Sequence, residues 1–200
     1  SKTYNSVSGF NEDKVGAEVF LNTGTGKQIN LTLNPDFGQA ESDEVIVNFS
    51  AQETFYSEKR AFFNENQSLF DLSHYDRYRV INTRRIGAAS SYDCEAASDV
   101  DDCNNAKKSY TDIDFALRYT QKNNNSDFGI FVAQESDESY TKGRNFYALR
   151  SKSMVGSRSI GYFLTHVVNN FTNEKATVNV VYFTKVRRNK STIYTVLLSS

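Results

Sequence analysis

The 200-residue chain has no tryptophan, one proline, one methionine and two cysteines, and it has no long apolar run. A membrane-spanning helix needs ~18 or more consecutive apolar residues, so the sequence does not indicate one. A transmembrane β-barrel is not excluded, because each of its strands needs only ~9–11 residues of alternating character. The formal net charge of −1 argues against a nucleic-acid partner, which would require a basic face.

The chain is instead rich in aromatic residues, with 12 Tyr and 15 Phe. Its mean hydropathy is −0.57, and small polar residues are frequent, which is typical of many β-strands joined by polar turns. Two hundred residues suffice for a sizeable core, so we expect a single domain over residues 1–200. The first ten residues lack the basic head and apolar run of a signal peptide, and we interpret the chain as a mature or excised piece.

The second half of the chain alternates apolar and polar residues with a period of two. In residues 111–120, Ile113, Phe115, Leu117 and Tyr119 share one predicted face. The opposite predicted face holds Asp112, Asp114, Ala116 and Arg118. Further strands are predicted at 127–135, 145–153, 159–168, 176–186 and 191–199. Short polar connectors separate them, so the fold class is all-β: an antiparallel up-and-down meander forming a barrel or part of a barrel.

The first half is less regular. Residues 14–22 and 27–34 alternate and flank Thr23–Gly26, which predicts a hairpin. Residues 44–50 predict another strand, and Tyr78–Ile81 is a shorter candidate.

The stretch 34–70 combines charges of both signs with aromatic residues, and Arg84 and Arg85 follow it. The candidate residues are Asp36, Glu41, Asp43, Glu53, Glu58, Lys59, Arg60, Arg84 and Arg85. One interpretation places them on a water-facing inner surface that binds a polar solute. The other, which we favour, is an ion-pair network that fixes a plug-like segment.

Several short motifs in this stretch and just after it follow one another in a characteristic order. They are residues 34–39 with Glu41 and Asp43, then 47–50, 53–56, 58–60, Phe62–Phe63, Leu69–Phe70 and 84–87. Their order and spacing resemble a bacterial outer-membrane β-barrel domain of unknown function, a family usually found behind a carbohydrate-binding, family-nine-like β-sandwich. The resemblance is densest across residues 28–87.

The resemblance implies the outer membrane of a Gram-negative bacterium, with membrane lipid as a partner and a glycan as a candidate solute. It also implies that the chain is an N-terminal portion of a longer barrel, and it implies no reaction. A periplasmic or secreted location is the alternative. An incomplete barrel has two bare sheet edges, so we expect self-association.

Residues 88–109 are small, acidic and aperiodic, which predicts an inserted loop. The loop contains both cysteines, and we expect a Cys94–Cys103 disulfide, in keeping with an oxidising compartment. Asp99, Asp101 and Asp102 are weak candidates for a calcium site. Their spacing does not fit a calcium-binding loop, so a solvated surface loop is the favoured interpretation and no cofactor is expected.

Five strand tyrosines are candidates for an interfacial aromatic girdle or for ordinary core packing: Tyr119, Tyr147, Tyr162, Tyr182 and Tyr194. Arg150 and Lys152 share the predicted face of Phe146 and Ala148, which favours a soluble all-β binding module. A carboxylate-dependent glycan hydrolase using Glu53 and Glu58 is a third hypothesis. No catalytic motif supports an enzyme, so we assign no catalytic residue.

Overall fold

The structure is a computed structural model that describes residues 16–35, 58–64, 67–70, 73–74, 78–187 and 190–199. The strand predicted at 44–50 lies outside the described residues, as do the candidates Asp36, Glu41, Asp43 and Glu53.

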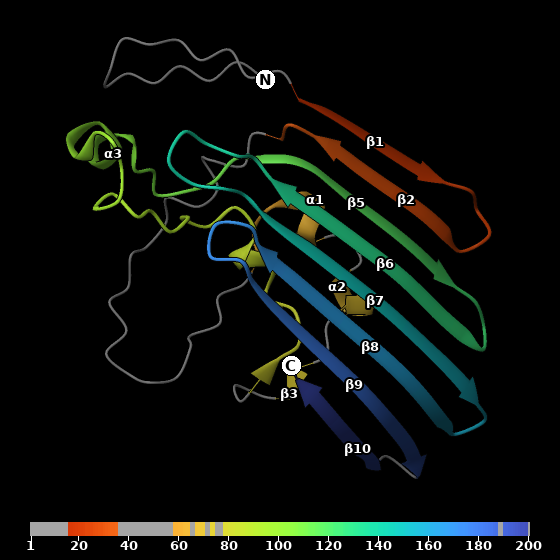
Figure 1. Cartoon of the computed structure of the whole chain (residues 1–200). Coiled ribbons are helices and arrows are strands. Elements are labelled where there is room, and N and C mark those ends of the chain that lie inside the picture. The colour runs from red at the N-terminus through yellow and green to blue at the C-terminus, as the bar shows by residue number, and fades with distance from the viewer. Residues whose placement is uncertain are drawn as a thin grey trace.

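The described residues form one eight-stranded antiparallel sheet (Figure 1). Its strands, in sheet order, are β1 (Ala17–Asn22), β2 (Lys27–Leu33), β5 (Ile113–Lys122), β6 (Ser126–Glu135), β7 (Arg144–Val155), β8 (Arg158–Asn169), β9 (Glu174–Arg187) and β10 (Lys190–Ser199). The predicted all-β meander is therefore confirmed. Among the described residues the sheet is open, with β1 and β10 as its edges.

The predicted hairpin at Thr23–Gly26 joins β1 to β2. The side chain of Asn22 accepts a hydrogen bond from Gly24 N (3.0 Å), and Gly24 and Gly26 have positive φ angles of 70° and 73°. A Cβ at Gly26 would collide with the carbonyl oxygen of Lys122, so this turn requires glycine for both conformation and space.

The helices are short. They are α1 (Ala61–Asn64), α2 (Gln67–Phe70), the 3₁₀ turn η1 (Thr83–Arg85) and α3 (Val100–Ala106). The candidate strand at Tyr78–Ile81 is shorter than predicted: β4 (Tyr78–Arg79) pairs with β3 (Ser73–His74) in a two-stranded sheet. No helix in the described ranges is long and apolar enough to span a membrane.

The two faces of the large sheet differ in what lies against them. On the first, Arg118, Phe131, Ala148 and Thr165 stand side by side across β5 to β8. The α1 and α2 region packs on this face, where Phe63 and Phe70 contact Phe131; we call it the covered face. The opposite face is called the open face, and one of its rows is Leu117, Val132, Tyr147 and His166.

The core lies between the covered face and the α1 and α2 region. Its buried members are Phe62, Phe63, Leu69, Phe70, Ile86, Ile113, Ala116, Phe131, Ala133, Phe146, Ala148, Phe163 and Val180. Small residues on the sheet leave room for the phenylalanines of α1 and α2. The short helices are thus held by tertiary packing, because four-residue helices have little stability of their own.

The prediction for β5 was wrong in two respects. The register shifts between Ile113 and Phe115, so Ile113 lies in the core and does not share a face with Phe115 and Leu117. The face with Ala116 and Arg118, predicted to be polar, is the buried one. A β-bulge explains the first error, because one extra residue reverses the direction of the side chains before it.

Candidate functional site

The site is built around residues 58–64, 67–70 and 78–87, which we call the docked segment. Arg118 donates from Nη1 to the carbonyl oxygen of Phe62 (2.6 Å), and Arg150 donates from Nη1 to that of Leu69. Both arginines come from mid-strand positions of the covered face and are at most 7% exposed. Each guanidinium therefore holds one backbone carbonyl of the docked segment. The carbonyl oxygen in turn gives the buried guanidinium a hydrogen-bond partner, which a buried polar group needs.

Arg150 is also held from the side by aromatic rings. Its Nη2 donates to the hydroxyl of Tyr182 (2.9 Å), and its guanidinium carbon lies 5.5 Å from the ring centroid of Phe163. The ring of Tyr182 lies across Gly161, its register partner, where a Cβ would collide with the phenol. Gly161 thus leaves the space that lets Tyr182 reach Arg150.

An ion pair lies within the docked segment itself. Arg60 binds Glu58 through two hydrogen bonds of 2.8 Å, Nε to Oε1 and Nη2 to Oε2. Arg60 also donates to the carbonyl oxygens of Ile86 (2.6 Å) and Thr83 (2.8 Å), and the Thr83 hydroxyl donates to Glu58 (2.8 Å). The side chains of the pair are 1% and 2% exposed, so the network joins residue 60 to residues 83–86 in the protein interior.

Burial by itself raises the pKa of the Glu58 carboxyl. The hydrogen bonds and the charge of Arg60, with the hydroxyl of Thr83, outweigh that effect, and the pKa lies below its ordinary value of 4.5. Glu58 is therefore a buried carboxylate at neutral pH, already bound on both oxygens. The hydrolase hypothesis would require it to leave this pair.

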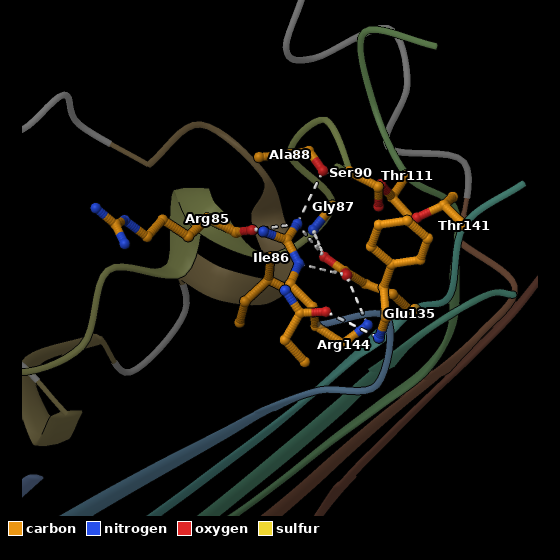
Figure 2. A network of polar contacts seen from close by, with 12 residues as sticks. Arg85, Ile86, Gly87, Ala88, Ser90, Thr111, Glu135, Thr141 and Arg144 are labelled. Atoms are coloured by element: carbon orange, nitrogen blue, oxygen red, sulfur yellow. Dashed lines mark hydrogen bonds and ion pairs between the residues drawn. The ribbon is translucent and has the colours of Figure 1, made fainter. Parts of the chain in front are cut away.

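A third network fastens the end of the docked segment to β6 and β7 (Figure 2). Glu135 accepts from Arg144 at both oxygens, with Nε at 2.7 Å and Nη2 at 2.8 Å, and it accepts from Gly87 N at 2.8 Å. Arg144 Nη2 also donates to the carbonyl oxygens of Arg85 (3.1 Å) and Ala88 (2.9 Å). The Glu135 side chain is fully buried. The Glu135–Arg144 ion pair thus binds three backbone groups of the turn at 85–88, which are Gly87 N, Arg85 O and Ala88 O.

The turn itself depends on Gly87, whose φ is +82°. Gly87 O accepts from Thr111 N (2.8 Å), and the Thr111 hydroxyl donates to Ala88 O (2.9 Å). An added Cβ at Gly87 would lie 3.3 Å from Thr111 O in a backbone conformation that other residues rarely adopt. The turn is thus seated between the start of β5 and the Glu135–Arg144 pair.

The predicted site residues separate into distinct groups. Glu58 and Arg60 form the buried pair, whereas Lys59 is exposed. Arg84 is half-buried, and the exposed side chain of Arg85 points away from Glu135 (Figure 2). A role of the whole set in solute binding stays a prediction.

Sequence reasoning missed Arg118, Glu135, Arg144 and Arg150 as site residues. Glu135 and Arg144 stand at the end of β6 and at the start of β7, where a charge is no unusual signal. Arg118 and Arg150 are charges inside strands, and at Arg150 we interpreted the charge as evidence for a soluble module. The structure gives a different reason: the face of Arg150 and Phe146 is the covered one. The objection to an apolar outer surface that we drew from Arg150 therefore falls away.

The predicted disulfide between Cys94 and Cys103 is present, with 5.5 Å between the Cα atoms. It ties α3 to the loop before it. Asp99 caps α3 by accepting from Asp102 N (2.9 Å), and Asp102 accepts from the Tyr140 hydroxyl (2.6 Å). No group of three or more His, Cys, Asp or Glu side chains suited to a metal was found among the described residues. The calcium site stays a prediction.

A shallow pocket of about 320 Å³ lies beside α3, lined partly by Tyr92, Lys108, Glu138 and Tyr140. Glu138 accepts from Tyr92 (3.1 Å) and Lys108 (3.2 Å). Burial, and then the charge of Glu138, raises the pKa of Tyr92. Burial lowers the pKa of Lys108, but the hydrogen bond and charge of Glu138 outweigh it, so this pKa is raised. The pocket is therefore lined by partnered charges.

The candidate tyrosines divide between the two faces. Tyr182 lies on the covered face beside Arg150. Four others lie on the open face, as their strand register shows: Tyr119, Tyr147, Tyr162 and Tyr194. The open face thus carries aromatic side chains on six of the eight strands once Phe128 of β6 and Phe183 of β9 are included.

Residues 28–114 match a family model described as a domain of unknown function (DUF5916), which is less than half of the 200-residue chain. No curated protein and no solved structure matches the chain. The matched region contains most of β2, the docked segment, the disulfide loop and the start of β5. The resemblance to a domain of unknown function is confirmed to that extent, while its outer-membrane nature and its neighbouring β-sandwich stay predictions. Residues 28–114 are thus similar to an uncharacterised family.

Proposed function

We propose that this chain is a wall segment of an outer-membrane β-barrel in a Gram-negative bacterium. In this proposal the open face contacts lipid, and the docked segment lies across an inner path for a polar solute. The observation that carries the proposal is the open face, because a soluble protein rarely leaves such a wide apolar surface to water.

Exposed apolar side chains of the open face extend from β1 to β10. They are Val19, Leu21, Leu33, Ile130, Tyr147, Val155, Ile160, Tyr162, Val181, Phe183, Tyr194, Val196 and Leu198. Polar side chains in the middle rows bind one another: Tyr162 donates to Asn179 (2.7 Å), and His166 Nδ1 lies 2.9 Å from the Thr177 hydroxyl. Such pairing lowers the cost of placing polar groups in hydrocarbon.

The lengths of the strands agree with the proposal. Strands β5 to β10 contain 10 to 14 residues each. A tilted strand that crosses a bilayer needs ~9–11 residues. Cations of the open face such as Lys27, Lys175 and Lys185 lie at or near strand ends, where headgroups and water would meet them.

The covered face supports the second half of the proposal. It places Arg118, Thr120, Arg150 and Thr165 among its apolar residues. A face of this kind suits the polar interior of a barrel better than a lipid contact. A glycan is the solute that we would test first, on the strength of the resemblance stated above.

Replacement of Ile130 by lysine tests the proposal, because Ile130 lies near the middle of the open face. In a bilayer the charge should cost about 2–4 kcal/mol at mid-depth, whereas at an exposed site in water it should cost less than about 0.5 kcal/mol. Ser153→Lys, near the end of β7 on the same face, is the matched control. The unfolding free energies are compared in detergent or lipid.

Detergent phase partition supplies the second measurement. We expect the chain to enter the detergent phase and Ile130→Lys to lose stability there, while Ser153→Lys stays close to the parent. A chain that remains in the aqueous phase and tolerates both substitutions equally would overturn the proposal. It would favour the alternative, a soluble all-β binding module whose partner covers the open face.

A further inference from the structure

We infer that the short-turn end of the sheet binds anionic lipid headgroups. The β1–β2, β5–β6 and β7–β8 turns lie at this end, as do the last residues of β9 and the first of β10 (Figure 1). The inference rests on the proposed membrane location and adds to it an orientation and a class of lipid.

The short-turn end gathers positive charge from five strands. We use the name turn-end cations for Lys27, Lys122, Lys152, Arg158 and Lys185. Within residues 22–27, 121–127, 152–159 and 183–187 of the described structure, Asp127 is the one acidic residue. Asp127 is the register partner of both Lys122 and Lys152, so positive charge remains in excess after their mutual pairing.

The opposite end of the sheet has the opposite character. Residues 88–112, 136–143 and 170–175 contain four lysines but nine acidic residues, which are Asp93, Glu95, Asp99, Asp101, Asp102, Asp112, Asp137, Glu138 and Glu174. The described part of the chain is therefore electrically asymmetric along its strands, although the formal net charge of the sequence is only −1. An anionic surface would attract one end and repel the other.

Apolar and aromatic side chains stand directly beside the turn-end cations. Ile160, Phe183 and Tyr194 form one cross-strand row of the open face, with Phe183 and Tyr194 ring centroids 6.4 Å apart. Arg158 and Lys185 are register partners two residues farther along the same face. Val155 pairs with Arg158 and is 78% exposed. The highly exposed apolar side chain of Val155 thus lies next to the cation Arg158.

Residue types follow one another along the open face in the same order as the layers of a membrane surface. Apolar residues come first, then the aromatic row, then the cations, which corresponds to hydrocarbon, interface and phosphates. Two residues of a strand span roughly 7 Å, so the cations would reach the headgroups when the aromatic row lies at the interface. Lysine and arginine ammonium and guanidinium groups are suited to phosphate oxygens.

Vesicle flotation with the whole 200-residue chain tests the inference. One vesicle population is phosphatidylcholine alone, and the other contains equal parts of phosphatidylcholine and phosphatidylglycerol. The double variant Arg158→Gln with Lys185→Gln removes two exposed turn-end cations. Lys107→Gln with Lys142→Gln removes two exposed lysines from loops at the opposite end and is the matched control.

We expect the parent chain to bind the anionic vesicles more tightly than the phosphatidylcholine vesicles. Added salt should weaken its binding to the anionic vesicles. Each cation removed should lower the partition coefficient about fivefold, so the turn-end double variant should lose about twentyfold or more and the control little. Equal binding of the parent to both vesicle types, or equal losses in the two double variants, would overturn the inference and leave the membrane proposal standing. Failure to bind either vesicle would overturn the membrane proposal and this inference with it.

The parent chain alone keeps the inference testable if a variant does not fold. Binding to the anionic vesicles that is independent of ionic strength would contradict it. A far-ultraviolet circular dichroism spectrum unchanged from the parent qualifies a variant for comparison.

Discussion

Arg144 and Glu135 face each other across β7 and β6, and their side chains share two hydrogen bonds of 2.7 and 2.8 Å. The Glu135 side chain is fully buried, and that of Arg144 is 20% exposed. Together they hold the backbone of residues 85–88, so this pair links the sheet to the docked segment.

Glu135→Gln should destabilise the fold because it leaves the Arg144 guanidinium without its counter-charge. We expect the unfolding free energy to fall by about 3 kcal/mol. Urea unfolding measures the change. Glu174→Gln removes an exposed carboxylate and should change the stability by less than about 0.5 kcal/mol. Equal effects of the two substitutions would show that the buried pair does not fasten the segment.

The Glu58–Arg60 pair should make stability depend on pH. The folded pKa of Glu58 lies below 4.5, so the unfolded chain takes up the proton first as the pH falls. The contribution is fully present above the unfolded pKa and is lost as the pH falls through the folded pKa. Glu58→Gln should therefore be less stable than the parent at neutral pH, and the gap should narrow under acidic conditions. A gap that is constant across this range would contradict the pairing.

Gly129→Ala tests how closely α2 approaches the sheet. A Cβ there would lie 2.7 Å from both Leu69 Cδ2 and Phe70 Cζ, so we expect a loss of about 1–3 kcal/mol from overpacking. In the Leu69→Ala background the same substitution should cost less, because the colliding methyl is gone. A double-mutant cycle measures the difference. If the losses of unfolding free energy from the two substitutions were strictly additive, α2 would not pack against Gly129.

Reduction of Cys94–Cys103 should loosen the loop more than the sheet. The loop closed by the disulfide is short, and its constraint contributes about 2–3 kcal/mol through the unfolded state. After reduction, hydrogen exchange should quicken around α3, whereas amides of β6 to β8 should keep their protection. The Cys94→Ser and Cys103→Ser double variant should reproduce this result. Uniform loss of protection would show that the loop supports the whole fold.

The strand positions in the second half of the chain could be predicted because period-two alternation is a local signal. Likewise, the glycines of residues 23–26 identify the first hairpin directly. Which face would be buried could not be predicted in this way. That outcome depends on the docked segment, whose Phe62 and Leu69 meet Arg118 and Arg150 across 56 and 81 residues of sequence.

The candidate site was harder to predict than the fold, because most of its contacts join residues far apart in the sequence. Glu58 and Arg60 are close in sequence and were identified together. Arg118 and Arg150 bind backbone carbonyls, which carry no residue-specific signal. The buried position of Ile113 could not be predicted either, because the register shift that turns this side chain inward leaves the sequence alternation intact.

The order of the strands has a consequence for how the chain reaches its folded state. From β5 to β10 each strand pairs with the next along the chain, so short loops close first at small entropic cost. The pairing of β2 with β5 must instead enclose residues 34–112. Long-range pairing of this kind is slow, so the β1–β2 hairpin should join a preassembled ribbon as the last step.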